Sequence, residues 1–121
     1  MAAEKTLQVG RSLFPGALEM MVLESLRRQP AHGYALVQHI QARSNNLLQV
    51  EEGSLYPALQ RLLKTKLVRA EWGVSATSRR VRTYTITAAG LRELERKRIG
   101  FRQMFDGIAL VLAPEGAPSG L

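Results

Sequence analysis

The sequence predicts a mainly α-helical fold with one β-hairpin, its elements in the order α-α-α-β-β-α. Three short segments repeat apolar residues at helical spacing, two segments then alternate apolar and polar residues, and a long helical pattern follows that ends before Pro114. A chain of 121 residues fits one such domain, because its halves would bury too little surface to fold separately. This order of elements is that of a winged helix-turn-helix.

The first two helices are expected at residues 17–29 and 34–44. Pro15 and Gly16 precede the first helix, and the stretch QPAHG separates it from the second. Apolar residues recur every three or four positions in both segments, which predicts one buried face on each helix. The buried faces are expected to consist of Leu18, Met21, Val22 and Leu26, and of Tyr34, Val37 and Ile40.

The third helix is expected at residues 54–65, with two contrasting faces. Ser54 is predicted to cap it, and Pro57 falls in its first turn, where the missing N–H costs little. Its apolar face would pack on the first two helices, which leaves the polar and basic face free. The apolar face consists of Leu55, Ala58, Leu59, Leu62 and Leu63, and the free face of Tyr56, Gln60, Arg61 and Lys64.

After the third helix the pattern changes to a period of two, which predicts a hairpin. The strand LVRAEW places Val68, Ala70 and Trp72 on one face, and the strand VRTYTI places Tyr84 and Ile86 on a shared face. Residues 73–82, which include the turn-rich loop between the strands, form the predicted wing.

The last helix is expected at residues 88–112, capped by Thr87. The winged helix-turn-helix domain is therefore assigned to residues 13–87 and the closing helix to 88–112. We expect a flexible N-terminal segment at 1–12, and a disordered tail rich in Gly and Pro at 113–121.

The apolar residues of the last helix alternate between spacings of three and four, which is typical of packing against another helix. Leu91 and Leu94 are expected to pack on their own domain. Beyond Arg98, which interrupts the series, the helix is longer than a small domain can cover, so that half is predicted to form a dimer interface. The expected interface residues are Phe101, Phe105, Ile108 and Leu112.

Charge gives the first indication of function. The chain has 17 Lys and Arg against 10 Asp and Glu, and its net charge is +7. Seven of these cations lie between residues 61 and 82, where Glu71 is the one acid, so most of the excess is in a single segment. Such clustering indicates a polyanion partner, and the fold favours double-stranded DNA.

The predicted DNA contacts come from the third helix and the wing. Arg and Gln side chains recognise purine edges, Lys holds phosphate, and close arginines in a hairpin repel one another unless phosphate lies between them. Two copies of the chain would place two such helices on successive grooves of a pseudo-palindromic site. The predicted contact residues are Ser54, Tyr56, Gln60, Arg61, Lys64, Arg79, Arg80 and Arg82.

Several other functions find little support. The chain has two histidines and no cysteine, Glu51 and Glu52 are adjacent rather than convergent, and no phosphate-binding Gly-rich motif is present. We therefore expect no enzymatic activity, no metal site and no cofactor. No apolar run reaches the length of a membrane span and no signal-peptide pattern begins the chain, so a cytoplasmic location is expected.

Four stretches, AHGYALVQHIQ, VEEGSLYPALQRLLK, RAEWG and SRRVRTYTITAAG, resemble in order and spacing the PadR family of bacterial transcriptional regulators. The resemblance spans about Leu18 to Leu112, and LQVEEGSLYPAL also resembles a subgroup described from acidobacteria. It implies a homodimeric repressor of the short PadR class, with Gly53 to Lys64 as the reading helix and the last helix as the dimer element. Some members release DNA when small aromatic molecules bind near the dimer interface. Phe101 and Phe105 are candidates for lining such a site, but packing in the core or the interface is the favoured use of both.

Two positions depart from the family. Lys66 follows the reading helix where members often have glycine, so this helix is expected to end without a left-handed cap. Thr83 stands where members commonly carry a tyrosine, so no stacking role is expected there. Two other functions remain open on these residues: an RNA-binding winged helix that uses the same basic face, and a dimeric protein-interaction module.

Overall fold

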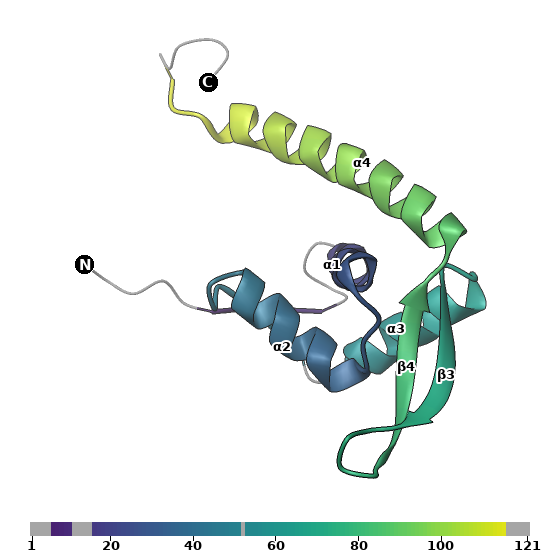
Figure 1. Ribbon diagram of the computed structural model, residues 1–121. Coiled ribbons are helices and arrows are strands. Elements are labelled where there is room, and N and C mark those ends of the chain that lie inside the picture. Colours follow the sequence, from purple (N-terminus) through teal and green to yellow (C-terminus); the bar gives the residue numbers. More distant parts are fainter. Residues whose placement is uncertain (1–5, 11–15, 52, 116–121) are drawn as a thin grey trace.

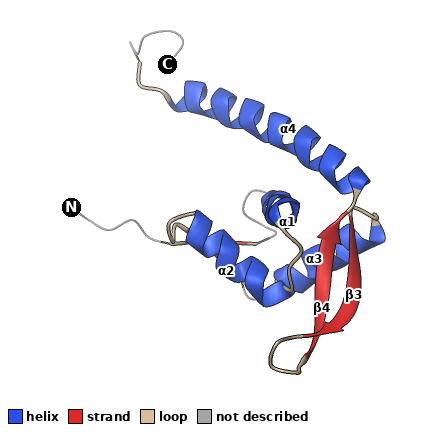
Figure 2. Cartoon of the chain, viewed as in Figure 1, coloured by secondary structure: helices blue, strands red, loops and turns tan. Residues whose placement is uncertain are grey.

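The computed structural model describes residues 6–10, 16–51 and 53–115, and it confirms the predicted fold class (Figure 1). Three helices precede an antiparallel hairpin and a long closing helix, as the colours of Figure 2 show. The elements are β1 (Leu7–Val9), α1 (Ala17–Arg28), α2 (Gly33–Arg43), β2 (Leu48–Val50), α3 (Leu55–Lys64), β3 (Val68–Val74), β4 (Arg80–Ile86) and α4 (Ala88–Leu112).

The core lies where the first three helices meet the base of the hairpin. Leucines of α1, α2 and α3 are its largest fully buried side chains, because their helical spacing turns one apolar stripe of each helix inward. Val68 and Tyr84 close the core from the hairpin, and Leu94 closes it from α4. The free face of α3 therefore points away from this core.

The inward face of α2 differs from the expected one. Gly33, Leu36 and Ile40 are buried, whereas Tyr34 is 66% exposed and Val37 is half-buried. The expectation for Tyr34 is wrong because the buried stripe of α2 runs through Gly33, Leu36 and Ile40, so Gly33 rather than Tyr34 faces α3 in the first turn. A methyl group added to Gly33 would lie 2.8 Å from the Tyr56 hydroxyl oxygen.

The N-terminal strand was not expected. Residues 7–9 pair in parallel with β2 in the connection between α2 and α3, and Val9 and Val50 are buried there. The predicted flexibility of residues 1–12 is therefore wrong for this part of the segment. Strand pairing satisfies backbone groups that an isolated three-residue strand would leave to water. Residues 1–5 and 11–15 lie outside the described residues.

The end of α3 also differs from the prediction. Lys66 adopts a left-handed conformation with φ of 61°, although it is not glycine. The amide of Lys66 donates to the Leu63 carbonyl oxygen over 3.0 Å, and the amide of Leu67 donates to that of Leu62 over 3.0 Å. This pair of bonds is the Schellman arrangement that usually requires glycine.

Helix α4 begins as predicted. The Thr87 hydroxyl accepts a 3.0 Å hydrogen bond from the Gly90 amide and lies 2.8 Å from the Lys66 carbonyl oxygen, to which it donates. Leu94 is buried as predicted, but Leu91 is 44% exposed, so its expected packing on the domain is wrong. From Arg98 to Leu112 every residue is exposed, and Figure 1 shows this half of α4 extending beyond α1. Residues 116–121 of the predicted tail lie outside the described residues.

Candidate nucleic-acid interface

The exposed face of α3 carries Tyr56, Gln60 and Lys64, as the helical spacing predicts. Tyr56 is 61% exposed, and its hydroxyl lies over the start of α2 next to Gly33. The buried face consists of Leu55, Ala58, Leu59 and Leu62, which fix the rotation of the helix about its axis. Amide, ammonium and phenol groups are thus presented together on one side of α3.

Two predicted contact residues lie elsewhere on α3. Ser54 is at the N-cap but its side chain makes no capping hydrogen bond, so that prediction is wrong. Its backbone is helical rather than extended, and its hydroxyl lies beside Gly10. The Arg61 guanidinium forms an ion pair with Glu19 of α1, which draws this side chain toward the helical core. Contact of either residue with DNA stays a prediction.

The register of the hairpin gathers a second group of side chains. Trp72 is directly opposite Arg82, and Val74 is opposite Arg80. Because side chains alternate along strands, Trp72, Arg80, Arg82 and Tyr84 share one face of the hairpin. The guanidinium carbon of Arg80 lies 4.6 Å from the centroid of the Trp72 ring, and that of Arg82 lies 5.8 Å from it.

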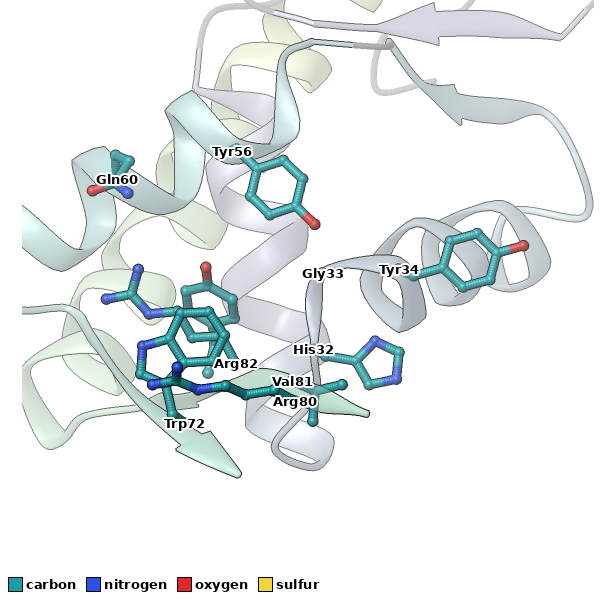
Figure 3. A pocket seen from close by; sticks show the side chains of 10 residues that line it. His32, Gly33, Tyr34, Tyr56, Gln60, Trp72, Arg80, Val81 and Arg82 are labelled. Carbon is teal, nitrogen blue, oxygen red and sulfur yellow. The ribbon is translucent and has the colours of Figure 1, made fainter. Parts of the chain in front are cut away.

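A cavity of about 380 Å³ lies between this hairpin face, α3 and the start of α2 (Figure 3). Its walls include Tyr56 and Gln60 from α3, and Trp72, Arg80 and Arg82 from the hairpin. A second, more open hollow of about 520 Å³ is lined by Gln60, Lys64 and Arg82, among others. Gln60 and Arg82 line both, so α3 and the hairpin present one continuous surface.

The arginines of the hairpin carry unpaired charge. Within residues 6–10, 16–51 and 53–115, no carboxylate oxygen lies within 4.0 Å of the side-chain nitrogens of Arg79, Arg80 or Arg82. Glu71 is opposite Thr83, on the other face of the hairpin. Arg79 lies in the loop before β4, where its backbone amide donates a 3.2 Å hydrogen bond to the Ser75 hydroxyl oxygen. The cavity therefore has a positive wall.

The predicted dimer residues lie on the projecting half of α4. Phe101, Phe105, Ile108 and Leu112 are all exposed, with Phe105 at 62%. The rings of Phe101 and Phe105 stack with their centroids 6.3 Å apart. None of the four belongs to the core of this chain. No helix among the described residues is long and apolar enough to span a bilayer.

Ion pairs join α1 to the first half of α4. Arg27 donates to both carboxylate oxygens of Glu24 over 2.9 and 2.7 Å, and Arg98 of α4 donates to one of them over 2.6 Å. The hydrogen bond from Arg27 is the largest cause that lowers the pKa of Glu24 below its ordinary value, and the charges of Arg27, Arg98 and Arg28 add to it. Within α4, the hydrogen bond from Arg96 lowers the pKa of Glu93 in the same way.

Sequence reasoning did not single out Trp72 as part of the site. Its alternation with Val68 and Ala70 predicted the correct face, but also suggested burial, whereas Trp72 is 58% exposed. Only the first residues of β3 reach the core, so the outer half of the hairpin projects into solvent. An exposed tryptophan in register with arginines was the available signal.

A helix with a free polar face, fitted beside a hairpin with unpaired arginines, defines a winged helix-turn-helix DNA-binding protein. Residues 22–96 match the PadR-like family of transcriptional regulators, and the chain belongs to this family. The family and its solved relatives are regulators of transcription rather than enzymes.

Solved structures agree with this assignment. The PadR family transcriptional regulator from Eggerthella lenta is 32% identical, with a TM-score of 0.70 over 84% of this chain and 85% of that one. A PadR-like regulator from Bacillus cereus is 28% identical, with a TM-score of 0.68 over 83% of this chain and 95% of that one. A transcriptional regulator from Clostridium thermocellum, 23% identical, has the same fold, with a TM-score of 0.74 over 81% and 95%.

Proposed function

We propose that the protein is a homodimeric repressor that binds a pseudo-palindromic operator. In this proposal α3 enters the major groove and the wing lies along flanking phosphates. The observation that carries it is the continuous surface on which the amide of Gln60 and the ammonium of Lys64 adjoin the guanidinium groups of the hairpin. Base-reading and phosphate-binding groups are both needed for operator recognition, and this surface offers both.

The exposed apolar half of α4 supports the dimer. The apolar residues at positions 101, 105, 108 and 112, called the seam below, lie along one side of the helix. They become buried only if a second helix packs against them. A second copy of the chain offers the matching seam. In a symmetric dimer the two α3 helices would read half-sites about one DNA turn apart, on the order of 34 Å.

The DNA proposal is tested by fluorescence anisotropy with duplexes from the region upstream of the protein's own gene and with shuffled duplexes. We expect Gln60→Ala to weaken binding to the true site by about 1–3 kcal/mol while hardly changing binding to shuffled DNA. Lys64→Ala should weaken both similarly. Gln103→Ala, the same change at an exposed position of α4, is the matched control and should leave both unchanged.

The other results of this experiment separate the competing functions. Preference for structured RNA over both duplexes would favour an RNA-binding role, and absence of binding to any nucleic acid at low salt would favour a protein-interaction module. Repression is tested separately with a promoter–reporter fusion. Loss of the regulator should raise reporter output, and a fall in output would indicate an activator instead.

The aromatic effector stays a proposal as well. A hollow of about 400 Å³ is lined by Met20 of α1 and by Arg98, Phe101, Phe105 and others from α4. Two stacked rings beside an arginine suit a planar acid. The same rings also belong to the proposed dimer seam, so an effector bound here would act on the position of α4 relative to its partner.

A further inference from the structure

The proposed function does not explain why a tryptophan lies exposed on the DNA-facing hairpin. Trp72 does not belong to the core, because it lies beyond the pair formed by the partly buried Ala70 and the buried Tyr84 in the hairpin register. Its ring instead lies beside two guanidinium groups. The guanidinium carbons of Arg80 and Arg82 are 4.6 and 5.8 Å from the ring centroid. Both distances are within the range of cation–π attraction.

The two arginines are held in an arrangement that opposes their charge. Arg80 and Arg82 are two residues apart on the same face of β4, so their side chains project side by side. Like charges in such positions repel, and no described carboxylate separates them. The face of an indole ring is negatively polarised and attracts both guanidinium groups. Contact with the Trp72 ring therefore offsets part of this repulsion, and the guanidinium carbon of Arg82 also lies 5.8 Å from the centroid of the Tyr84 ring.

One donor of this group has no acceptor. The Nε atom of Arg82 is buried and lacks a hydrogen-bond partner in the described part of the chain. The cavity beside it is lined by the phenol of Tyr56 and the amide of Gln60 as well as by both arginines. Figure 3 shows the Arg82 guanidinium on the side of the cavity toward Gln60, with the Trp72 ring and Arg80 below it. An anionic group is an acceptor that several such donors can share.

We propose that Trp72 is a positioning residue that holds Arg80 and Arg82 as a paired clamp for one DNA backbone phosphate between the hairpin and α3. This inference rests on the proposed DNA-binding function and specifies how one phosphate is held. A phosphodiester fits because it offers acceptor oxygens to two guanidinium groups at once. It also fits the place, since α3 in the major groove brings the flanking backbone beside the hairpin.

The clamp can first be tested without DNA, because Trp72 is the one tryptophan of the chain. Its fluorescence is quenched by the anion iodide and by neutral acrylamide. Arg80→Gln and Arg82→Gln should each reduce iodide quenching by about twofold while leaving acrylamide quenching unchanged, because the arginines concentrate anions at the ring. Arg43→Gln, which removes an exposed arginine from α2, is the control. Equal iodide quenching in all variants would overturn the clamp.

The second test measures the salt dependence of operator binding for Trp72→Leu and Trp72→Phe. Trp72→Leu changes no charge, yet the negative slope of log K against log salt should shrink in magnitude by about one, since the clamp on one phosphate is lost. Trp72→Phe keeps a ring and should retain most of the wild-type slope. Circular dichroism and thermal melting verify that both variants are folded.

The outcomes separate the clamp from the function on which it rests. An unchanged slope in Trp72→Leu, with or without weaker binding, would overturn the clamp and leave the DNA-binding proposal intact, because Trp72 would then contact DNA itself or do nothing. Wild-type protein that bound no duplex would overturn both. A reduced slope that Phe restores, together with the iodide result, supports the positioning role.

Discussion

At the scale of single residues, Lys66 shows how tertiary contacts override a local preference. A left-handed backbone costs a non-glycine residue roughly 1–2 kcal/mol, because its Cβ crowds the carbonyl oxygen. The strain persists because the amides of Lys66 and Leu67 cap the end of α3 and the Lys66 carbonyl oxygen accepts from the Thr87 hydroxyl. The turn therefore joins the end of α3 to the start of α4.

Lys66→Gly is expected to raise the free energy of unfolding by about 0.5–1 kcal/mol. Glycine relieves the left-handed strain, and this gain exceeds the extra freedom it gives the unfolded chain. Lys64→Gly is the matched control, because Lys64 is in the last turn of α3 with ordinary helical geometry and should lose about the same amount. Urea denaturation of the three proteins measures both effects, and a destabilised Lys66→Gly would show that the strain argument is mistaken.

Residue types and spacing predicted most of the site, but they did not predict side-chain partners. The exposed positions of Tyr56, Gln60 and Lys64 follow from helical periodicity alone. The partner of Arg61 could not be predicted, because Glu19 is 42 positions away and packing alone brings them together. The grouping of Trp72 with the arginines depends on the register of the hairpin. The spacing of apolar residues in the two strands limits the possible registers but does not determine which one forms.

At the scale of elements, the position of α4 on the domain depends on a short stretch. Gly90 has no room for a side chain, since an added Cβ would lie 2.1 Å from the Leu67 carbonyl oxygen. Leu94 is buried one turn later, and Arg98 reaches Glu24 of α1 after another turn. These contacts set the direction in which the free half of α4 leaves the domain.

The ion pairs of Glu24 with Arg27, Arg28 and Arg98 predict that stability depends on pH. Because the folded-state pKa of Glu24 is below its ordinary value of about 4.5, its contribution is fully present above that pH and is lost as pH falls through the folded pKa. Glu24→Gln should therefore be less stable than wild type at pH 7, by about 0.2–1 kcal/mol for exposed ion pairs, and nearly equal to it near pH 2.

Glu93→Gln separates the effect on α4 from a general loss of charge. The pKa of Glu93 is lowered in the same direction, but its partner Arg96 lies within the same helix. Both variants should show the pH-dependent loss when unfolding by urea is followed at several pH values. Only Glu24→Gln should also speed hydrogen exchange in the first half of α4. Equal exchange rates in the two variants would show that Glu24 does not hold α4 on α1.

The extent of elements was more predictable than their docking. The bounds of α4 follow from Thr87 and Pro114, since capping and chain-breaking residues act locally. Strand β1 was missed because three residues carry too little periodicity, and its partner is 41 positions away. Pairing between distant short strands depends on the finished fold.

At the scale of the whole molecule, one chain leaves an apolar face of α4 in water. The described half of α4 beyond Arg98 is exposed throughout, although it contains two phenylalanines, two isoleucines and further aliphatic residues. Such a surface favours association, and the seam spacing favours a second α4 as its cover. The dimer, in turn, determines how far apart the two α3 helices lie, so operator spacing depends on α4.

Phe105→Glu is expected to raise the dimer dissociation constant by at least about 100-fold, because a carboxylate in an apolar seam loses its hydration without gaining a partner. Gln103→Glu is the matched control, since it adds the same charge to the same exposed helix two positions away and off the seam. Size-exclusion chromatography with light scattering measures the assembly, and anisotropy measures binding to full and half operators. Phe105→Glu should bind the half-site as wild type does but lose most of its affinity for the full operator. A Phe105→Glu protein that stayed dimeric would place the interface elsewhere, and the spacing argument would fail with it.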